Sequence, residues 1–187
     1  MLTKNKPFVH AFAIVGLVAL SACGSGAETD AADGSTQIDE TDTLAAALGK
    51  LPELSTVNSA IVTADLNTVF DGVGSYTLLA PSDEAFAALG EAGQALMNEE
   101  QKPILVGVLR NHILPGYLQP EDIAKAIDAK GGAVTMTTLG GGDVTFTKDG
   151  ETITVAREDG ASAQFSGKAV AASNGVVIPI GAVLQPQ

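Results

Sequence analysis

The sequence has no tryptophan, and only 4% of its 187 residues are aromatic. Its single cysteine, Cys23, excludes an intramolecular disulfide and any zinc or iron–sulfur site built on several thiolates. Basic side chains are also few, because 10 Lys and Arg stand against 22 Asp and Glu and leave a formal net charge of −12. Phosphate binding needs clustered Lys and Arg, so this charge argues against a nucleic-acid partner.

The hydrophobic fraction is nevertheless 45%, which predicts a core built mainly from Ala, Val, Leu and Ile. The length suits one domain with accessory segments. It is too short for a barrel enzyme with a separate substrate domain.

Residues 1–22 have the pattern of an export signal. Lys4 and Lys6 precede an apolar stretch over residues 8–20, which is shorter than the about 20 residues of a membrane span. Residues 20–23, Leu-Ser-Ala-Cys, resemble the lipobox of bacterial lipoproteins, and this resemblance implies cleavage before Cys23 and a diacylglycerol on its sulfur. An ordinary secretory signal is the alternative. We expect an exported protein, lipid-anchored to a bacterial membrane, and the residue after the cysteine, glycine, favours the outer membrane.

Residues 23–42 predict an acidic, flexible tether. Positions 24–42 carry six acids and no base, and Ile38 is their only large apolar residue. Such a segment buries too little surface to offset the entropy of ordering it. A divalent-cation site is the alternative, but the acids lack EF-hand spacing.

Residues 43–187 predict one α+β domain. Apolar residues recur at helical spacing from Leu44, and helical patterns continue to about residue 129, interrupted by a short strand at 76–80. After residue 132 the period changes to 2, and Asp149-Gly150 is a strong hairpin signal. We therefore expect a layer of helices packed on a strand-rich sheet.

Short polar and glycine signals predict where elements begin and turn. Ser82 is placed to cap a helix, and residues 98–101 read as a capping box. Asn174-Gly175 predicts a tight turn with positive φ values. Pro179 lacks a ladder donor, which predicts that the last strand lies at an edge or is bulged there.

Three stretches, residues 76–86, 109–116 and 172–178, together resemble a fasciclin (FAS1) domain. The resemblance covers about residues 40–186 and implies a single FAS1-like domain, a helical layer on a β-sheet wedge. It also implies a module for adhesion and extracellular protein or matrix contacts, typically without a catalytic centre. His112 and Asn174 match the family pattern and are carried over as structural residues.

The pattern departs from the family at two places. Asn111 replaces the usual aromatic residue before His112, and Pro179 and Gly181 interrupt the last strand. Adhesion determinants of the family around this segment are therefore not carried over. His112, Asn111 and Asn174 remain candidates for a structural or a partner-contacting role.

No combination of residues predicts catalysis. His112 has no nucleophile or acid nearby in the sequence, so we expect it to hydrogen-bond to the backbone, with partner contact as the alternative. Residues 140–142 are three glycines, but without the Lys-Ser/Thr of a phosphate loop they predict a flexible hairpin loop. Asp83 and Glu84 are adjacent on a helix and diverge by roughly 100°, which spoils acid–base pairing. We expect no catalytic residue, metal or cofactor.

The sequence thus predicts a non-enzymatic, lipid-anchored adhesion or interaction module that binds protein or polysaccharide at the cell surface or matrix and contacts the membrane only through its lipid. The alternative is a periplasmic carrier of a small apolar ligand or lipid, which requires an apolar cavity of roughly 300 Å³ or more. A hydrolase would require a hydroxyl or carboxylate within about 3.2 Å of His112. The oligomeric state stays open.

Overall fold

The computed structural model describes residues 36–39 and 41–185. The predicted signal peptide, Cys23 and the tether up to residue 35 lie outside the described residues. Within the part that is described, no helix is both long and apolar enough to cross a bilayer.

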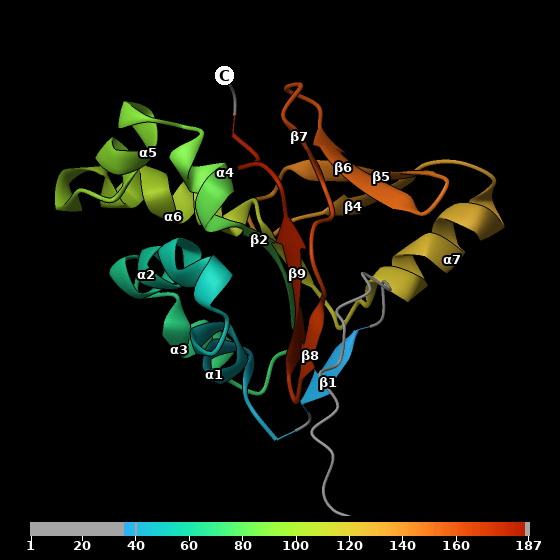
Figure 1. Cartoon of the computed structure of the whole chain (residues 1–187), viewed down its shortest axis with the longest axis horizontal. Coiled ribbons are helices and arrows are strands. Elements are labelled where there is room, and N and C mark those ends of the chain that lie inside the picture. Colours follow the sequence, from blue (N-terminus) through green and yellow to red (C-terminus); the bar gives the residue numbers. More distant parts are fainter. Residues whose placement is uncertain (1–35, 40, 186–187) are drawn as a thin grey trace, which may run out of the picture. The chain divides into compact units, whose positions relative to one another are not determined.

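Two sheets form the strand-rich part of the molecule (Figure 1). The first has the order β1-β8-β9-β2-β3 and mixes parallel and antiparallel pairs. Its strands are β1 (Gln37–Asp39), β2 (Tyr76–Pro81), β3 (Ile113–Pro115), β8 (Val170–Ala172) and β9 (Gly175–Ile180). The second is an antiparallel meander of β4 (Val134–Thr137), β5 (Asp143–Asp149), β6 (Thr152–Arg157) and β7 (Ser162–Gln164).

Helices occupy most of the chain before residue 131. They are α1 (Leu44–Gly49), η1 (Pro52–Leu54), α2 (Ser55–Thr63), α3 (Asn67–Phe70), α4 (Asp83–Ala87), α5 (Glu91–Leu96), η2 (Glu99–Gln101), α6 (Lys102–Arg110) and α7 (Pro120–Lys130). Figure 1 shows α1 to α6 on one side of the first sheet, and α7 with the second sheet on the other. The predicted α+β class is confirmed.

The first sheet is buried on both faces, and neighbouring residues of its strands enter different cores. Leu78 of β2 packs with the helices, whereas Leu79 packs with α7 and the second sheet. In β9, Val177 faces the helices and Val176 faces the second sheet. A strand buried on both faces needs a continuous apolar run. Each such side chain stabilises the fold by about 1.5–3 kcal/mol when it is fully buried.

Main-chain hydrogen bonds join the two sheets at two places. Leu139, which follows β4, donates to the carbonyl of Ile113 in β3 at 2.8 Å. At the other junction Phe165 bridges Ile180, and Ser166 N–H donates to the Pro179 carbonyl at 2.8 Å. The sheets are therefore held together at both junctions, which gives the wedge that the resemblance implied.

The helix-capping predictions had different outcomes. Ser82 caps α4, since its hydroxyl accepts a hydrogen bond from Ala85 N–H at 3.2 Å. The capping box at residues 98–101 is wrong, because Asn98 makes no side-chain cap bond and η2 stands between it and α6. The first turn takes the tighter 3-10 form, so Asn98 is not the residue before an α-helix.

Two predictions at the last strand need correction. Gly175 and Asn174 do not have positive φ values, so the glycine is not required for a left-handed turn. A Cβ on Gly175 would lie 2.3 Å from the carbonyl oxygen of Tyr76, so close packing of β9 on β2 requires the glycine. β9 is a central strand rather than an edge. Its pairing with β8 ends at Val177, so Pro179 lies beyond the part of β9 that is paired with β8.

The predicted tether is wrong for its last part. Gln37–Asp39 forms β1, which pairs in parallel with β8 in the register Gln37 to Val170. Composition alone could not predict this strand. Its order comes from main-chain hydrogen bonds to an existing sheet edge.

Candidate functional site

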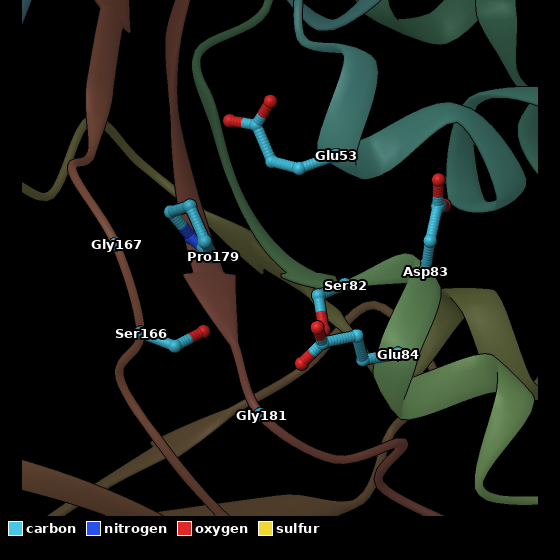
Figure 2. A pocket seen from close by; sticks show the side chains of 8 residues that line it. All are labelled: Glu53, Ser82, Asp83, Glu84, Ser166, Gly167, Pro179 and Gly181. Carbon is cyan, nitrogen blue, oxygen red and sulfur yellow. The ribbon is translucent and has the colours of Figure 1, made fainter.

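An open cleft of about 550 Å³ lies where the helical layer meets the end of β9 (Figure 2). Its lining comes from four places in the chain: η1, the start of α4, the segment between β7 and β8, and the end of β9. The lining residues are Glu53, Ser82, Asp83, Glu84, Ser166, Gly167, Pro179 and Gly181.

The strand-to-helix turn after β2 builds one wall of this cleft. Pro81 ends β2 and Ser82 caps α4, so α4 leaves the sheet in a fixed direction. Asp83 then reaches across to α2, where it accepts hydrogen bonds from Ser55 Oγ and Thr56 N–H, each at 2.7 Å. The carboxylate thereby serves as an N-terminal cap for α2 that is supplied by another helix.

The same contacts set the charge of Asp83. Partial burial raises the pKa of the carboxyl, but the hydrogen bonds from Ser55 and Thr56 oppose this and hold the pKa below its usual value. Asp83 is thus an ionised structural group. Figure 2 shows it pointing toward the helices, whereas Glu84 points away from it toward Ser166 and Gly181. The predicted divergence of the two acids is what the structure has.

The lining of the cleft has two further carboxylates and no basic side chain. Glu53 and Glu84 are exposed, and none of the eight lining residues is basic. Among the described residues, no group of three or more His, Cys, Asp and Glu is arranged to hold a metal ion. What the lining offers is hydrogen-bond acceptors, two serine hydroxyls and negative charge, which suits binding of donor groups or cations.

His112 does not lie in this cleft but in the core, where it is 1% exposed. Its Nδ1 donates to the carbonyl of Val108 at 2.8 Å, and its Nε2 accepts from Leu184 N–H at 2.8 Å. This pattern fixes the neutral tautomer with the proton on Nδ1. Burial, with Arg157 adding to it, lowers the pKa of His112 to about 4, although the bond to Val108 opposes the shift.

The Leu184 peptide that His112 binds is held from a second side. Arg157 of β6 donates to the Leu184 carbonyl at 3.2 Å and forms an ion pair with Asp159 at 3.0 Å. The last turn of the described chain is therefore tied to both α6 and the second sheet. Of the two predicted roles for His112, its geometry is that of the structural one.

Asn174 connects three segments through its amide. Its Oδ1 accepts from Leu44 N–H at 2.7 Å, and its Nδ2 donates to the carbonyls of Phe70 and Gly72 at 2.7 and 2.8 Å. The side chain thus pairs a main-chain N–H in the first turn of α1 and main-chain carbonyls at the end of α3, while the backbone of Asn174 leads into β9. Joining these three segments is a structural role, and nothing in the sequence indicated these partners.

Asn111 ends α6 beside the loop that joins β4 and β5. Its Oδ1 accepts a hydrogen bond from Thr138 at 3.4 Å and would lie only 2.1 Å from a Cβ on Gly140. The glycine loop is further held by a bond from Gly140 N–H to the Arg110 carbonyl at 2.9 Å. It is the predicted hairpin loop, but it is docked on α6 rather than free.

The predicted candidates are therefore not brought together. His112, Asn111 and Asn174 occupy three separate places, none of them in the cleft, and Cys23 lies outside the described residues. Sequence analysis considered Asp83 and Glu84 only as a catalytic pair. Ser166 was considered only as a nucleophile and rejected for lack of flanking glycines, and Glu53 was not considered, because nothing in the sequence indicates that η1 and the segment after β7 approach α4.

Two other hollows bear on the carrier alternative. One, of about 460 Å³, lies between α7 and the second sheet, and another of about 320 Å³ lies beside β7. Both are open to solvent. The larger has Glu121 and Glu151 on its lining, and its apolar residues Ile153 and Ile178 are packed in the core at 6% and 1% exposure. These hollows reach the expected volume, but they are surface grooves and do not favour a carrier of apolar ligands.

Comparison with known proteins identifies relatives of this chain. The sequence model of the family described as Fasciclin domain matches residues 52–186. A protein named sll1483 from Synechocystis is 33% identical over 135 residues, covering 71% of this chain and 67% of that protein. The transforming growth factor-beta-induced protein ig-h3 of the pig is 31% identical over 132 residues, or 70% of this chain. The aligned part spans only 17% of the pig protein.

A solved structure gives the same fold. It is a FAS1 domain pair from the insect cell adhesion molecule Fasciclin I, with a TM-score of 0.69 over 78% of this chain and 51% of that chain. The sequences are 14% identical, so this likeness concerns the fold alone.

Proposed function

This chain belongs to the fasciclin domain family, and we propose that it is a non-enzymatic interaction module attached to a bacterial envelope through a lipid on Cys23. It contacts protein or polysaccharide on the cell surface or matrix. The membership rests on the family match over residues 52–186 and on the 33% identity to the Synechocystis protein. The insect neighbour, described as a cell adhesion molecule, shares the fold of this chain.

The observation that carries the proposal is the state of His112. Both of its ring nitrogens are bonded to main-chain groups of Val108 and Leu184, and the side chain is 1% exposed. A general base needs a nitrogen within reach of a substrate proton. His112 has none, and it is the only histidine among the described residues. This supports a contact made by the outer surface of the domain.

The acidic cleft is the part of that surface best suited to a contact. Glu53 and Glu84 leave two carboxylates exposed on walls that come from separate elements, and Ser82 and Ser166 add hydroxyls to the lining. Cationic or donor-rich groups of a protein or polysaccharide partner complement such a lining. With a net charge of −12, the chain disfavours anionic partners.

An adhesion assay with two cleft variants tests this function. Beads carrying the chain through its N-terminal side are incubated with envelope material that was left untreated, digested with protease or oxidised with periodate. We expect retention on the untreated material and loss after one treatment, protease for a protein partner and periodate for a polysaccharide. The Glu53→Gln, Glu84→Gln double variant should retain several-fold less.

Glu99→Gln, Glu100→Gln is the matched control, because it removes the same charge from exposed residues of η2 that do not line the cleft. Equal losses in the two double variants would show that net charge, not the cleft, drives adhesion. Failure of the unaltered chain to adhere to any envelope preparation would refute the interaction module.

Mass spectrometry of the N-terminal peptide tests the anchor. A diacylated Cys23 at the first position of the processed chain is expected. An unmodified thiol on Cys23 would refute lipid attachment and leave the interaction proposal to the adhesion assay alone.

A further inference from the structure

We propose that the groove between α7 and the second sheet binds an extended peptide segment of a partner protein. In this complex an apolar side chain of the segment lies on the groove floor, and basic side chains lie at the carboxylates of Glu121 and Glu151. The proposal rests on the proposed function and deepens it, because it names the partner as a protein and gives the chemistry that is recognised. We call this hollow of about 460 Å³ the α7 groove.

The floor of the α7 groove is apolar. Ala169 and Ile178 are packed in the core at 5% and 1% exposure, whereas Ala124 and Phe165 are half-buried and leave part of their side chains at the surface. Apolar surface inside a hollow, rather than on a convex face, is typical of a binding site. The apolar lining residues are Pro120, Ala124, Ile153, Phe165, Ala169 and Ile178.

The aromatic wall of the α7 groove is held in place by its neighbours. Phe165 N–H donates to the Ile153 carbonyl at 2.9 Å, and Phe165 also bridges Ile180 of β9. Its ring meets the buried ring of Phe146 edge-on, with the ring centroids 6.1 Å apart. A partner side chain therefore meets a preformed wall, and binding does not have to order this ring first.

Each wall of the α7 groove supplies one carboxylate. Glu121 comes from the first turn of α7, and Glu151 from the turn between β5 and β6. Glu151 is exposed, and it forms no hydrogen bond or ion pair with any other residue that the structure describes. Both carboxylate oxygens of Glu121 accept from the Thr36 hydroxyl at 3.1 Å, which leaves them further lone pairs. No basic residue lines the groove, so its charge complements a cationic ligand.

The chain's own N-terminal segment does not supply such a ligand. Residues 24–35 contain three acids and no base. Lys4 and Lys6, further upstream, belong to the predicted signal peptide. The charge of the α7 groove therefore complements a basic segment of another protein rather than residues 24–35.

The α7 groove meets the acidic cleft at Gly167, which lines both hollows. Gly167 is exposed and has a φ of +70°, and a Cβ on it would lie 3.8 Å from Pro179, the residue beside it in Figure 2. Because Gly167 has no side chain, only main chain separates the two hollows there. An extended peptide advances by about 3.3–3.6 Å per residue, so a segment that crosses Gly167 can place residues in both hollows. This continuity favours a polypeptide over a small amine.

Binding of short peptides to the whole chain provides the first test, followed by fluorescence anisotropy at physiological ionic strength. The probe is fluorescein-labelled Gly-Lys-Lys-Phe-Lys-Lys-Gly. We expect it to bind at least tenfold more tightly than the same peptide with Ser in place of Phe, and than the same peptide with Glu in place of Lys. Equal binding of the Ser peptide would overturn the proposal, because net charge alone would then attract the probe. Equal binding of the Glu peptide would overturn the role of the two carboxylates.

A variant that fills the α7 groove locates the binding site. Ala124→Gln places a longer, neutral side chain in the groove and should weaken binding of the Phe peptide by at least tenfold. Ala129→Gln is the matched control, because Ala129 is exposed on the same helix and does not line the groove. It should bind within twofold of the unaltered chain. Undiminished binding by a folded Ala124→Gln chain would overturn the site.

The carboxylates are tested in the same assay. Glu121→Gln, Glu151→Gln should weaken binding of the Phe peptide several-fold more than Glu99→Gln, Glu100→Gln, which removes the same charge from exposed residues of η2. Equal weakening would show that the peptide responds to net charge and would overturn the assignment to the α7 groove.

Nuclear magnetic resonance on the unaltered chain keeps the site testable if Ala124→Gln does not fold. The Phe peptide should shift the amide signals of Ala124, Phe165 and Gly167, and shifts confined to other residues would overturn the proposal. Spermidine, a small amine without an apolar side chain, should not displace the peptide at equal concentration. Displacement would assign the site to small amines and overturn the peptide partner.

The peptide assay and the adhesion assay fail separately. Adhesion to envelope material by a chain that does not distinguish the three peptides would overturn the α7 groove and leave the proposed function standing. Selective peptide binding by a chain that adheres to no envelope preparation would support the α7 groove and refute the envelope partner.

Discussion

His112 makes stability depend on pH in a direction that its contacts determine. Its pKa falls from 6.5 to about 4 in the folded chain, because burial and Arg157 disfavour the charged ring and a proton on Nε2 would break the bond from Leu184. The unfolded chain therefore takes up a proton that the folded chain refuses. The contribution of neutral His112 to the free energy of unfolding is therefore complete above pH 6.5. It is lost as the pH falls toward 4, and the loss amounts to about 3 kcal/mol.

Chemical denaturation at pH 7, 6, 5 and 4 checks this prediction. The free energy of unfolding should fall over that range more steeply for the unaltered chain than for His112→Gln, which cannot titrate. The difference between the two chains cancels the carboxylates and His10, which they share. Parallel curves would show that His112 is protonated equally in both states.

Gly175 is predicted to tolerate no side chain, although its backbone is not in the left-handed region. A Cβ there would lie 2.3 Å from the Tyr76 carbonyl oxygen, and this main-chain atom cannot move without separating β9 from β2. Gly175→Ala should lower the free energy of unfolding by at least about 2 kcal/mol. Gly107→Ala is the control, because nothing lies within 4 Å of its Cβ and alanine favours the helix interior by about 0.8–1.0 kcal/mol. Urea denaturation of both variants measures the contrast, and equal stabilities would contradict it.

The sequence predicts what single residues do only where the cause is local. Ser82 was identified as a cap because its partner, Ala85, is three residues away. Asn174 drew attention because Gly175 follows it in a turn signal. Its hydrogen bonds, however, reach Leu44 and Phe70, which are 130 and 104 positions away. The same holds for Gly175, whose constraint is a carbonyl on another strand. Long-range contacts of this kind leave no periodic or neighbouring signal.

One carboxylate, Asp83, joins α4 to the start of α2 by hydrogen bonds. It accepts from Ser55 and Thr56 at the start of α2, where Leu54, the residue in the N-cap position, has no side-chain cap bond. Asp83→Ala should therefore destabilise the chain by about 1–2 kcal/mol, the usual effect of losing a cap. Thermal unfolding at neutral pH measures it. Glu84→Ala removes the adjacent, exposed acid, and its effect should stay within about 0.5 kcal/mol; a loss equal to that of Asp83→Ala would mean that charge, not capping, matters.

Helices and strands were predictable where apolar residues repeat within the element itself. The helical spacing before residue 131 and the alternation after it both correspond to observed elements, and Asp149 and Thr152 flank the predicted hairpin turn. β1 was missed because its sequence is polar and acidic, and it forms only against the edge of β8. The cleft was missed for a related reason, since Glu53, Glu84 and Ser166 meet only when three elements pack.

The whole domain is two cores separated by one sheet. Its helical half and its strand-rich half follow each other in the sequence, which made the α+β class predictable. The sequence did not indicate that α7 and the second sheet cover the far face of the first sheet. Leu78 and Leu79 are adjacent and of the same type, so nothing in the sequence shows that they enter different cores. The end of α6 contacts the loop after β4 at the junction between these halves.

That junction can be tested as a coupled pair. A Cβ on Gly140 would lie 2.1 Å from Asn111 Oδ1 and 3.2 Å from Asn111 N, so Gly140→Ala should push the loop off α6 and cost about 1–2 kcal/mol. Asn111→Ala removes the obstructing oxygen and gives up only the bond from Thr138 at 3.4 Å. The loss in free energy of unfolding of the double variant should therefore be about 1 kcal/mol smaller than the sum of the losses of the two single variants. Urea denaturation of all four chains measures these losses. Additive losses would mean that the loop can move away from Asn111 at no cost, and that the bonds from Leu139 to Ile113 and from Gly140 to Arg110 do not fix how the second sheet sits on the first.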